Sequence, residues 1–244
     1  MQERMRQHLS MFWDGNVAFT LPSAGSPADA VKIFKKNLAD ITWNCLSSFE
    51  SNPASLPQTE TILKGQSVSG ISIDDLMQVK NYGDGGKKLC ELVSDGTFRL
   101  DKNTACLLHN YVGKEESLTW GKFRDRLVHL HSIDIYTPPE SKYLHEIASR
   151  GFAFLDKEII QPIERAVAVF LFMSRTQFFF DANKRTASLM MNGVLLQNAF
   201  FPVAVMHHDS EKFHTTLRDF YNSGDAGDMM RFFQKSLLAM YRSE

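Results

Sequence analysis

The chain of 244 residues is poor in cysteine, in long apolar runs and in net charge. Its three cysteines, Cys45, Cys90 and Cys106, stand far apart with no CxxC pair, which favours free thiols in a reducing cytoplasm over a disulfide framework. No apolar run reaches the ~20 residues that a membrane-spanning helix needs, and the polar start is unlike a signal peptide. The formal charge of −1 gives no basic field for nucleic acid. We therefore expect a cytoplasmic globular protein that binds neither membranes nor nucleic acid.

Apolar residues recur at helical spacing through most of the chain. This spacing predicts helices near residues 28–50, 58–64, 73–94, 101–112, 118–127, 140–150, 156–175, 184–199, 209–222 and 225–241. Apolar and polar residues alternate over 128–136, which favours a short hairpin. The sequence thus predicts an all-α bundle with one small β-hairpin. A turn signal at Asp95-Gly96 and the patterns around it favour an N-terminal helical region over residues 1–100 and a core domain over residues 101–244.

A polar loop between two predicted helices is the most informative segment. Residues 177–188 read Gln-Phe-Phe-Phe-Asp-Ala-Asn-Lys-Arg-Thr-Ala-Ser. Free backbone N–H groups at a helix start, beside the cations Lys184 and Arg185, form an anion site, and the Asp181 carboxylate is a ligand for a divalent cation. Phosphate with Mg²⁺ fits such a loop. The alternative is that Asp181 is only a helix N-cap before a solvated first turn, although cations in a first turn oppose the helix dipole.

Residues 181–187, Asp-Ala-Asn-Lys-Arg-Thr-Ala, resemble the loop of the Fic/Doc family, usually written H-x-F-x-[D/E]-x-N-[G/K]-R. The resemblance implies a Fic-type helical bundle that transfers AMP from ATP, or another nucleotidyl or phosphoryl group, to protein side chains. It implies that Asp181 holds Mg²⁺ and that Asn183 orients the α-phosphate. It assigns the nucleotide phosphates to a run of five residues: Ala182, Asn183, Lys184, Arg185 and Thr186.

An upstream stretch resembles the family in order and distance. Gly121-Lys122-Phe123-Arg124, followed by the predicted hairpin and by Pro138-Pro139, is similar to the family's G-x-[FW]-R stretch and its flap. An exposed strand edge recruits a peptide by adding it as another strand. By the resemblance, the flap docks a target protein in this way. An ordinary surface hairpin is the alternative. The flap residues in question are Val128, His129, Leu130 and His131.

Residues 49–59 resemble the segment x-E-G-N-x-x-T-L-x-x-T of Fic proteins that carry an N-terminal inhibitory helix. By position, Glu50 is the glutamate that reaches the nucleotide pocket and blocks productive placement of the phosphates. Leu46 stands where the inhibitory motif has a hydroxyl, and Ser188 stands where many members have a second arginine. The alternative is therefore that Glu50 is only a polar residue at a helix end.

The catalytic position departs from the family pattern. The resemblance places the catalytic set at Gln177, Asp181, Asn183 and Arg185, and the family has a histidine at the first of these positions. That histidine takes the proton from a hydroxyl nucleophile, whereas an amide does not titrate near neutral pH. Loss of a positioned base costs about 10²–10⁴-fold in rate. Three hypotheses stay open: a nucleotidyl- or phosphoryltransferase impaired by Gln177, an inactive pseudoenzyme that senses nucleotide or binds protein, or a structural protein that works by its surface alone and keeps the loop as a relic.

Overall fold

A computed structural model describes residues 1–15, 17–130 and 136–240. The helices of this part of the chain are α1 (Gln2–Leu9), α2 (Pro27–Lys36), α3 (Leu38–Phe49), α4 (Leu56–Leu63), α5 (Ile73–Ser94), α6 (Lys102–Val112), α7 (Leu144–Glu158), α8 (Pro162–Thr176), α9 (Asn183–Gln197), α10 (Ser210–Ser223) and α11 (Gly227–Met240), with 3₁₀ turns η1 (Ser141–Tyr143) and η2 (His207–Asp209). No strand occurs in these residues, only isolated bridges between Phe12 and Asp225 and between Ser23 and Phe200. The all-α prediction is confirmed.

Several predicted helices differ from the observed ones. α1 was not predicted, and α7 runs to Glu158, so that the predicted helix over 156–175 begins only at Pro162, as α8. The predicted helix over 28–50 is divided at Asn37, whose side-chain Nδ2 donates to the carbonyl of Ile33 at 2.8 Å and caps the end of α2. The prediction of a helix over 118–127 is wrong, because this segment is irregular. Gly121 has φ +72° there, a left-handed conformation that glycine adopts easily. Arg124 is buried and binds three backbone carbonyls, which fixes the irregular path.

The predicted flap is only partly described. Val128, His129 and Leu130 follow an irregular path without strand pairing. The rest of the predicted hairpin, including His131, lies outside the described residues.

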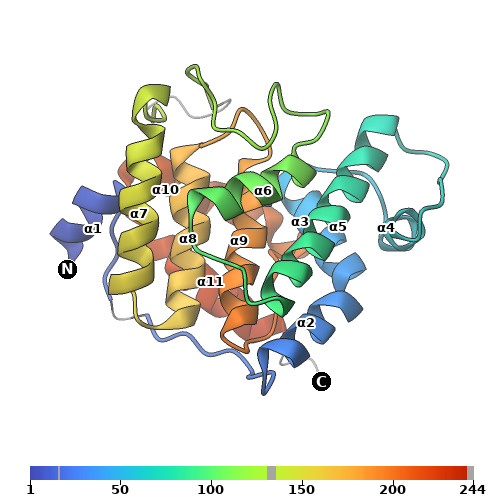
Figure 1. Cartoon of the computed structure of the whole chain (residues 1–244), viewed down its shortest axis with the longest axis horizontal. Coiled ribbons are helices and arrows are strands. Elements are labelled where there is room, and N and C mark those ends of the chain that lie inside the picture. Colours follow the sequence, from blue (N-terminus) through green and yellow to red (C-terminus); the bar gives the residue numbers. More distant parts are fainter. Residues whose placement is uncertain (16, 131–135, 241–244) are drawn as a thin grey trace.

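α9 lies at the centre of the molecule (Figure 1) and is buried along nearly its whole length. It packs most extensively against α8, and also against α6, α5, α2 and α3. In Figure 1, α7 and α6 lie on the near side of the bundle, while α10 and α11 lie behind α8 and α9. Elements from both halves of the chain therefore enclose the helix that begins at the predicted site. The division into residues 1–100 and 101–244 stays a prediction.

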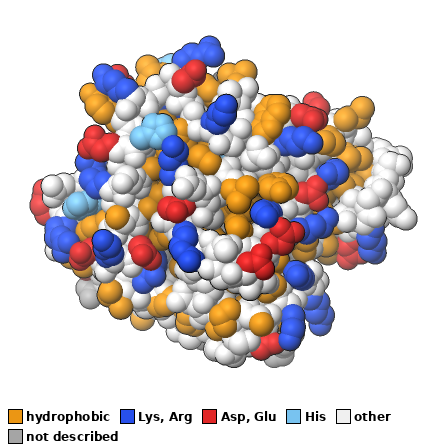
Figure 2. Space-filling view, in the orientation of Figure 1, with side chains coloured by type: hydrophobic (Ala, Val, Ile, Leu, Met, Phe, Trp, Pro, Cys, Tyr) orange, Lys and Arg blue, Asp and Glu red, His pale blue; other side chains and the backbone are white. Residues whose placement is uncertain are grey.

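Surface charge, the state of the cysteines and the apolar character of the helices can be compared with the expectations from composition. Figure 2 shows Lys and Arg side chains interspersed with Asp and Glu over the face that it presents. Cys45 and Cys90 are buried, Cys106 is half-buried, and all three are free thiols. Among the helices that the structure describes, none combines the length and the apolar character of a membrane span.

Candidate active site

The segment between α8 and α9, residues 177–182, forms the motif loop. It reverses direction with two residues in the left-handed conformation, Gln177 (φ 53°) and Ala182 (φ 57°). Phe178 and Phe179 are fully buried and anchor the loop in the core, whereas Phe180 is half-buried and lines a cavity. Buried aromatic rings thus fix the backbone from below and leave polar side chains at its outer face.

The cavity beside the motif loop has a volume of about 840 Å³. It joins three stretches that the sequence places far apart: the end of α3, the described part of the flap, and the motif loop with the start of α9. One face of α10 closes the fourth side. The lining residues are Glu50, Val128, His129, Leu130, Gln177, Phe180, Asp181, Asn183, Lys184, Glu211, His214, Thr215, Leu217, Arg218 and Tyr221. A volume of this size lies in the range of small-molecule sites.

The amides of Gln177 and Asn183 hold the motif loop in shape. Gln177 Nε2 donates to the carbonyl of Ser174 at 2.6 Å, and Gln177 Oε1 accepts from Asn183 Nδ2 at 2.9 Å. Asn183 Nδ2 also donates to the carbonyl of Phe179, and Asn183 Oδ1 accepts from the Phe179 N–H, both at 2.9 Å. The side chain of Asn183 is therefore engaged within the loop, and what it has left for a ligand is its backbone N–H in the first turn of α9.

Arg185 lies beneath the loop rather than in the cavity, and its side chain is 0% exposed. Its Nη1 and Nη2 bind the two carboxylate oxygens of Glu116 at 2.5 and 2.7 Å. Its Nε donates to Glu50 Oε1 at 3.1 Å, and Nη2 approaches Asp181 Oδ1 at 3.4 Å. Burial opposes the charge, but the surrounding carboxylates outweigh it and raise the pKa of Arg185 above its ordinary value. Arg185, which the sequence predicted to bind phosphate, therefore pairs with three carboxylates of the chain itself.

Asp181 offers a carboxylate to the cavity, and about half of its side chain is exposed. Oδ1 accepts from the Ala182 N–H at 2.5 Å, while Oδ2 has no hydrogen bond or ion pair with a residue that the structure describes. Mg²⁺ in nucleotide sites takes one or two carboxylates and completes its shell with water and substrate phosphates. Asp181 fits that donor set. The structure describes no cluster of three His, Cys, Asp or Glu side chains that would hold a metal without a substrate.

The remaining predicted phosphate ligands divide between the cavity and the core. Lys184 lines the cavity, but its Nζ donates to the carbonyl of Phe49, at the end of α3, at 2.8 Å. Thr186 is fully buried, and its Oγ1 donates to the carbonyl of Ala182 at 2.8 Å. Ala182 and Thr186 therefore shape the start of α9 and do not line the cavity.

Three residues that support the site were not predicted as site residues: Glu116, His109 and Arg124. His109 is fully buried and stacks on Phe179 with 3.8 Å between ring centroids. Its Nδ1 accepts from the Gly121 N–H at 3.0 Å, so its Nε2 carries the proton that is donated to the Asp181 carbonyl at 3.2 Å. Arg124 Nε donates to the carbonyl of Gln177 at 2.6 Å. Only Arg124 has a sequence signal, because it belongs to the Gly121–Arg124 stretch.

Comparison with known proteins agrees with this geometry. The model of the Fic/DOC family matches residues 99–195, which run from just before α6 into the last turn of α9. Over this stretch the chain is similar to the Fic/DOC family. The protein adenylyltransferase Fic of Culex quinquefasciatus is 27% identical over 188 residues, 75% of this chain and 37% of that protein. The protein adenylyltransferase fic-1 of Caenorhabditis briggsae is 27% identical over 194 residues, 77% of this chain and 38% of that protein. The chain thus spans under two-fifths of the length of these relatives.

Solved structures share the fold. A Fic-1 fragment from C. elegans superposes with a TM-score of 0.74 at 23% identity, over 88% of this chain and 67% of that chain. The structure of IbpAFic2 covalently tethered to Cdc42 gives a TM-score of 0.56 at 12% identity, over 97% of this chain and 69% of that chain. Both likenesses show that the helical arrangement is that of Fic domains.

Of two further positions that the resemblance named, Ser188 lies in the core and Glu50 borders the cavity. Ser188 is fully buried, and its Oγ lies 3.1 Å from the Tyr82 hydroxyl and 3.4 Å from Cys45 Sγ. The position of the second family arginine therefore faces the core between α3, α5 and α9. Glu50 caps the end of α3, lines the cavity and pairs with Arg185 rather than with a residue at position 188.

Proposed function

We propose that the chain handles a nucleotide in this cavity and modifies protein side chains by nucleotidyl or phosphoryl transfer of the AMPylation type, impaired by Gln177. The observation that carries the proposal is the cavity of about 840 Å³ walled by the Fic loop and the start of α9. Relatives named as protein adenylyltransferases support a nucleotide and a protein as the two substrates. A structural neighbour tethered to Cdc42 supports the second of these.

ATP with Mg²⁺ is the ligand that we assign to the cavity. Asp181 Oδ2 would hold the metal, which neutralises phosphate charge when it is bound. The free N–H groups in the first turn of α9 would receive phosphate oxygens, and Phe180 offers a ring to the base. Val128, His129 and Leu130 border the same cavity, where a docked protein segment would meet the nucleotide. A hydroxyl of that segment would attack the α-phosphorus, with pyrophosphate leaving and the hydroxyl proton passing to a base.

The base in that step is what this chain lacks. Gln177 cannot take a proton near neutral pH, and both ends of its amide are engaged, with Ser174 and with Asn183. This observation favours a second candidate function, a pseudoenzyme that binds nucleotide as a sensor or protein-binding module without transfer. The two candidates share the nucleotide site and differ only in the chemical step.

Nucleotide binding is tested by calorimetric titration with Mg²⁺-ATP, GTP, CTP and UTP. We expect saturable, Mg²⁺-dependent binding of at least one of them. Asp181→Asn should weaken binding at least tenfold in Mg²⁺, whereas Asp125→Asn, at a carboxylate 77% exposed in the loop after α6, should bind as the parent does. If none of the four nucleotides binds, the proposal is wrong and a protein-interaction scaffold remains.

Transfer is tested separately by restoring the base. Gln177→His should gain transfer of labelled AMP to the chain itself or to an added protein, and Gln177→His with Asp181→Asn should lose that gain. Binding without transfer in Gln177→His would support the sensing module instead.

The proposed inhibitory role of Glu50 has its own test. Glu50 borders the cavity and pairs with Arg185, so its charge faces incoming phosphate. Glu50→Gln should bind Mg²⁺-ATP several-fold more tightly than the parent. Unchanged affinity would support the alternative, a polar residue that only caps α3.

A further inference from the structure

The cations around the cavity are not equally available to a ligand. The Lys184 amino group is bound to the carbonyl of Phe49. His214 donates its Nε2 proton to the carbonyl of Ser48 at 2.7 Å, and burial lowers the pKa of its imidazole, which keeps it neutral at pH 7. Lys184 keeps its charge and two further donors, but this bond holds its amino group toward the end of α3, whereas the imidazole of His214 has its Nε2 donor engaged.

Arg185 is less available still. A guanidinium has five N–H donors in a rigid fork. Glu116 takes two of them in a bidentate pair, Glu50 takes a third, and Asp181 approaches a fourth. The side chain is 0% exposed and does not line the cavity. Glu116 is fixed in turn, because it accepts from Gln78 Nε2 of α5 at 2.8 Å. This arrangement is that of a buried structural ion pair, connecting α9 to the loop after α6 and to α5.

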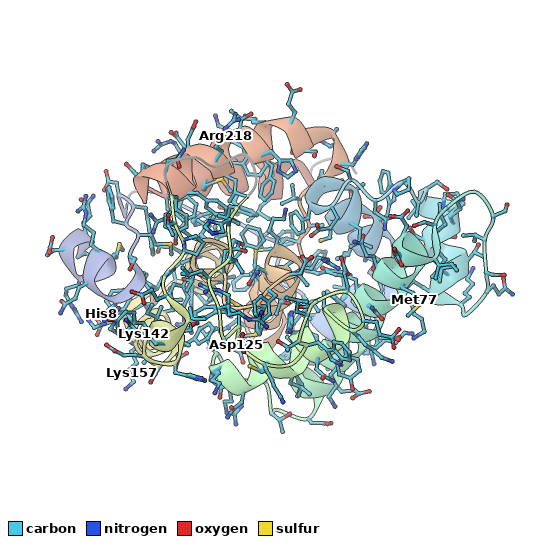
Figure 3. The ribbon with its side chains drawn as sticks, turned by 90° about the horizontal axis from the view of Figure 1, so that it is seen from above. His8, Met77, Asp125, Lys142, Lys157 and Arg218 are labelled. Carbon is cyan, nitrogen blue, oxygen red and sulfur yellow. The ribbon has the colours of Figure 1, made fainter. Side chains whose placement is uncertain are left out.

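Arg218 has the opposite character. It lies on α10 (Figure 3), is exposed to solvent and lines the cavity. Its guanidinium makes no ion pair or side-chain hydrogen bond with any residue that the structure describes. Its donors are free for a planar, bidentate contact with phosphate oxygens. The start of α9, with its unpaired N–H groups, lines the same cavity through Asn183 and Lys184. A polyphosphate between α9 and α10 would meet donors on both sides.

We propose that Arg218, rather than the motif arginine Arg185, is the cation that binds the nucleotide phosphates, and that Glu116 holds Arg185 as a structural residue. The assignment rests on the proposed function in one respect, that the anion is the polyphosphate of a nucleotide. It gives Arg218 a role in affinity and Glu116 a role in stability, and the two roles are separable by measurement.

The first experiment compares Arg218→Gln with Lys212→Gln. Lys212 is an exposed cation on the same helix and lies outside the cavity lining. Affinities for Mg²⁺-ATP and for inorganic triphosphate are measured by calorimetry at two salt concentrations. Arg218→Gln should lose at least tenfold affinity for both probes at an unchanged unfolding midpoint, and Arg218→Lys should recover part of the loss. Lys212→Gln should match the parent. Unchanged affinity in Arg218→Gln would overturn the assignment.

The second experiment compares Glu116→Gln with Glu115→Gln. Glu115 is the neighbouring acid, 61% exposed, with its Oε1 3.7 Å from Lys114 Nζ. Glu116→Gln should lower the thermal midpoint clearly below that of Glu115→Gln while the dissociation constant for Mg²⁺-ATP stays within about twofold of the parent. If Glu116→Gln instead binds Mg²⁺-ATP several-fold more tightly, Arg185 is a phosphate ligand that Glu116 holds back, and the assignment is wrong.

The two probes separate this inference from the proposed function. Binding of inorganic triphosphate that depends on Arg218, without binding of any nucleotide, would support the Arg218 site and reject the nucleotide-handling function. Binding of Mg²⁺-ATP that is equal in the parent and in Arg218→Gln would support the nucleotide-handling function and reject the Arg218 site. Absence of binding to both probes would reject both.

Discussion

The imidazole of His109 joins three segments of the site. It receives the Gly121 N–H, donates to the carbonyl of Asp181 and stacks on Phe179. Burial lowers the pKa of His109 to about 4, whereas a histidine of the unfolded chain titrates near 6.5. The unfolded state therefore binds the proton more readily between these values. The stability that His109 contributes is complete above about pH 6.5 and is lost as the pH falls toward 4.

This difference in pKa gives a prediction at the residue scale. Over that pH window His109 alone should reduce the free energy of unfolding by about 3 kcal/mol, at ~1.4 kcal/mol per pKa unit. Urea unfolding of the parent and of His109→Gln at several pH values measures it. The variant should be less stable at pH 7.5 but show a shallower decline toward pH 4.5. His208→Gln, at an exposed histidine, should decline as the parent does. Parallel curves for the parent and His109→Gln would contradict this account.

At this scale the sequence could predict what is local and not what is distant. Asp181, Asn183 and Lys184 are close in the chain, so their common position at a helix start followed from the spacing and was observed in the cavity wall. Glu116 lies 69 residues from Arg185, and no pattern within the loop indicates that an acid from elsewhere neutralises the arginine. The same applies to His109, which stands in the ordinary amphipathic pattern of α6.

At the scale of elements, Lys184 connects the start of α9 to the end of α3. Its Nζ donates to the carbonyl of Phe49, one of the last carbonyls of α3, where a cation also complements the helix dipole. The sequence presented Lys184 only as a cation of the anion loop, because its partner lies 135 residues away. The contact places α3, and Glu50 at its end, against the cavity.

We expect Lys184→Met to lower the free energy of unfolding by about 2 kcal/mol, since it keeps the aliphatic stem and removes one charged hydrogen bond. Hydrogen exchange of the last amides of α3 should become faster in the same variant. Lys212→Met, at an exposed position of α10, should leave both quantities unchanged. Protection of the end of α3 that is equal in Lys184→Met and in the parent would show that the contact does not stabilise the helix end.

The sequence predicted those helices whose apolar spacing reflects packing against the core, and it failed where distant contacts decide the path. α5 was predicted at its observed bounds, because a long amphipathic repeat reports the core-facing side directly. The segment 118–127 has a comparable apolar spacing but is irregular, since Arg124 uses its donors on carbonyls of Gln177, Arg126 and Pro139. The Arg124 bonds to Arg126, Pro139 and Gln177 join carbonyls from separate segments, and periodicity does not report such contacts.

At the scale of the whole molecule, residues 1–100 and 101–244 share one core. The Tyr82 hydroxyl of α5 donates to Cys45 Sγ of α3 at 3.2 Å and lies 3.1 Å from Ser188 Oγ of α9. All three side chains are buried. α9 also packs against α2, so removal of the first hundred residues would expose one side of the central helix. Apolar surface of that extent opposes independent folding of the core domain.

We therefore expect one cooperative unfolding transition rather than two. Variants that keep only Trp43, in α3, or only Trp120, in the loop after α6, report on the two predicted regions, and their urea midpoints should coincide. Tyr82→Phe removes one buried hydroxyl, while Cys45 and Ser188 stay 3.4 Å apart and partner each other. It should cost about 1 kcal/mol and shift both midpoints equally. Tyr143→Phe, at a tyrosine 47% exposed, should shift neither. A Trp43 transition at lower urea than the Trp120 transition would show instead that the N-terminal region unfolds as a separate unit. The contacts among Tyr82, Cys45 and Ser188 would then not couple α3 and α5 to α9.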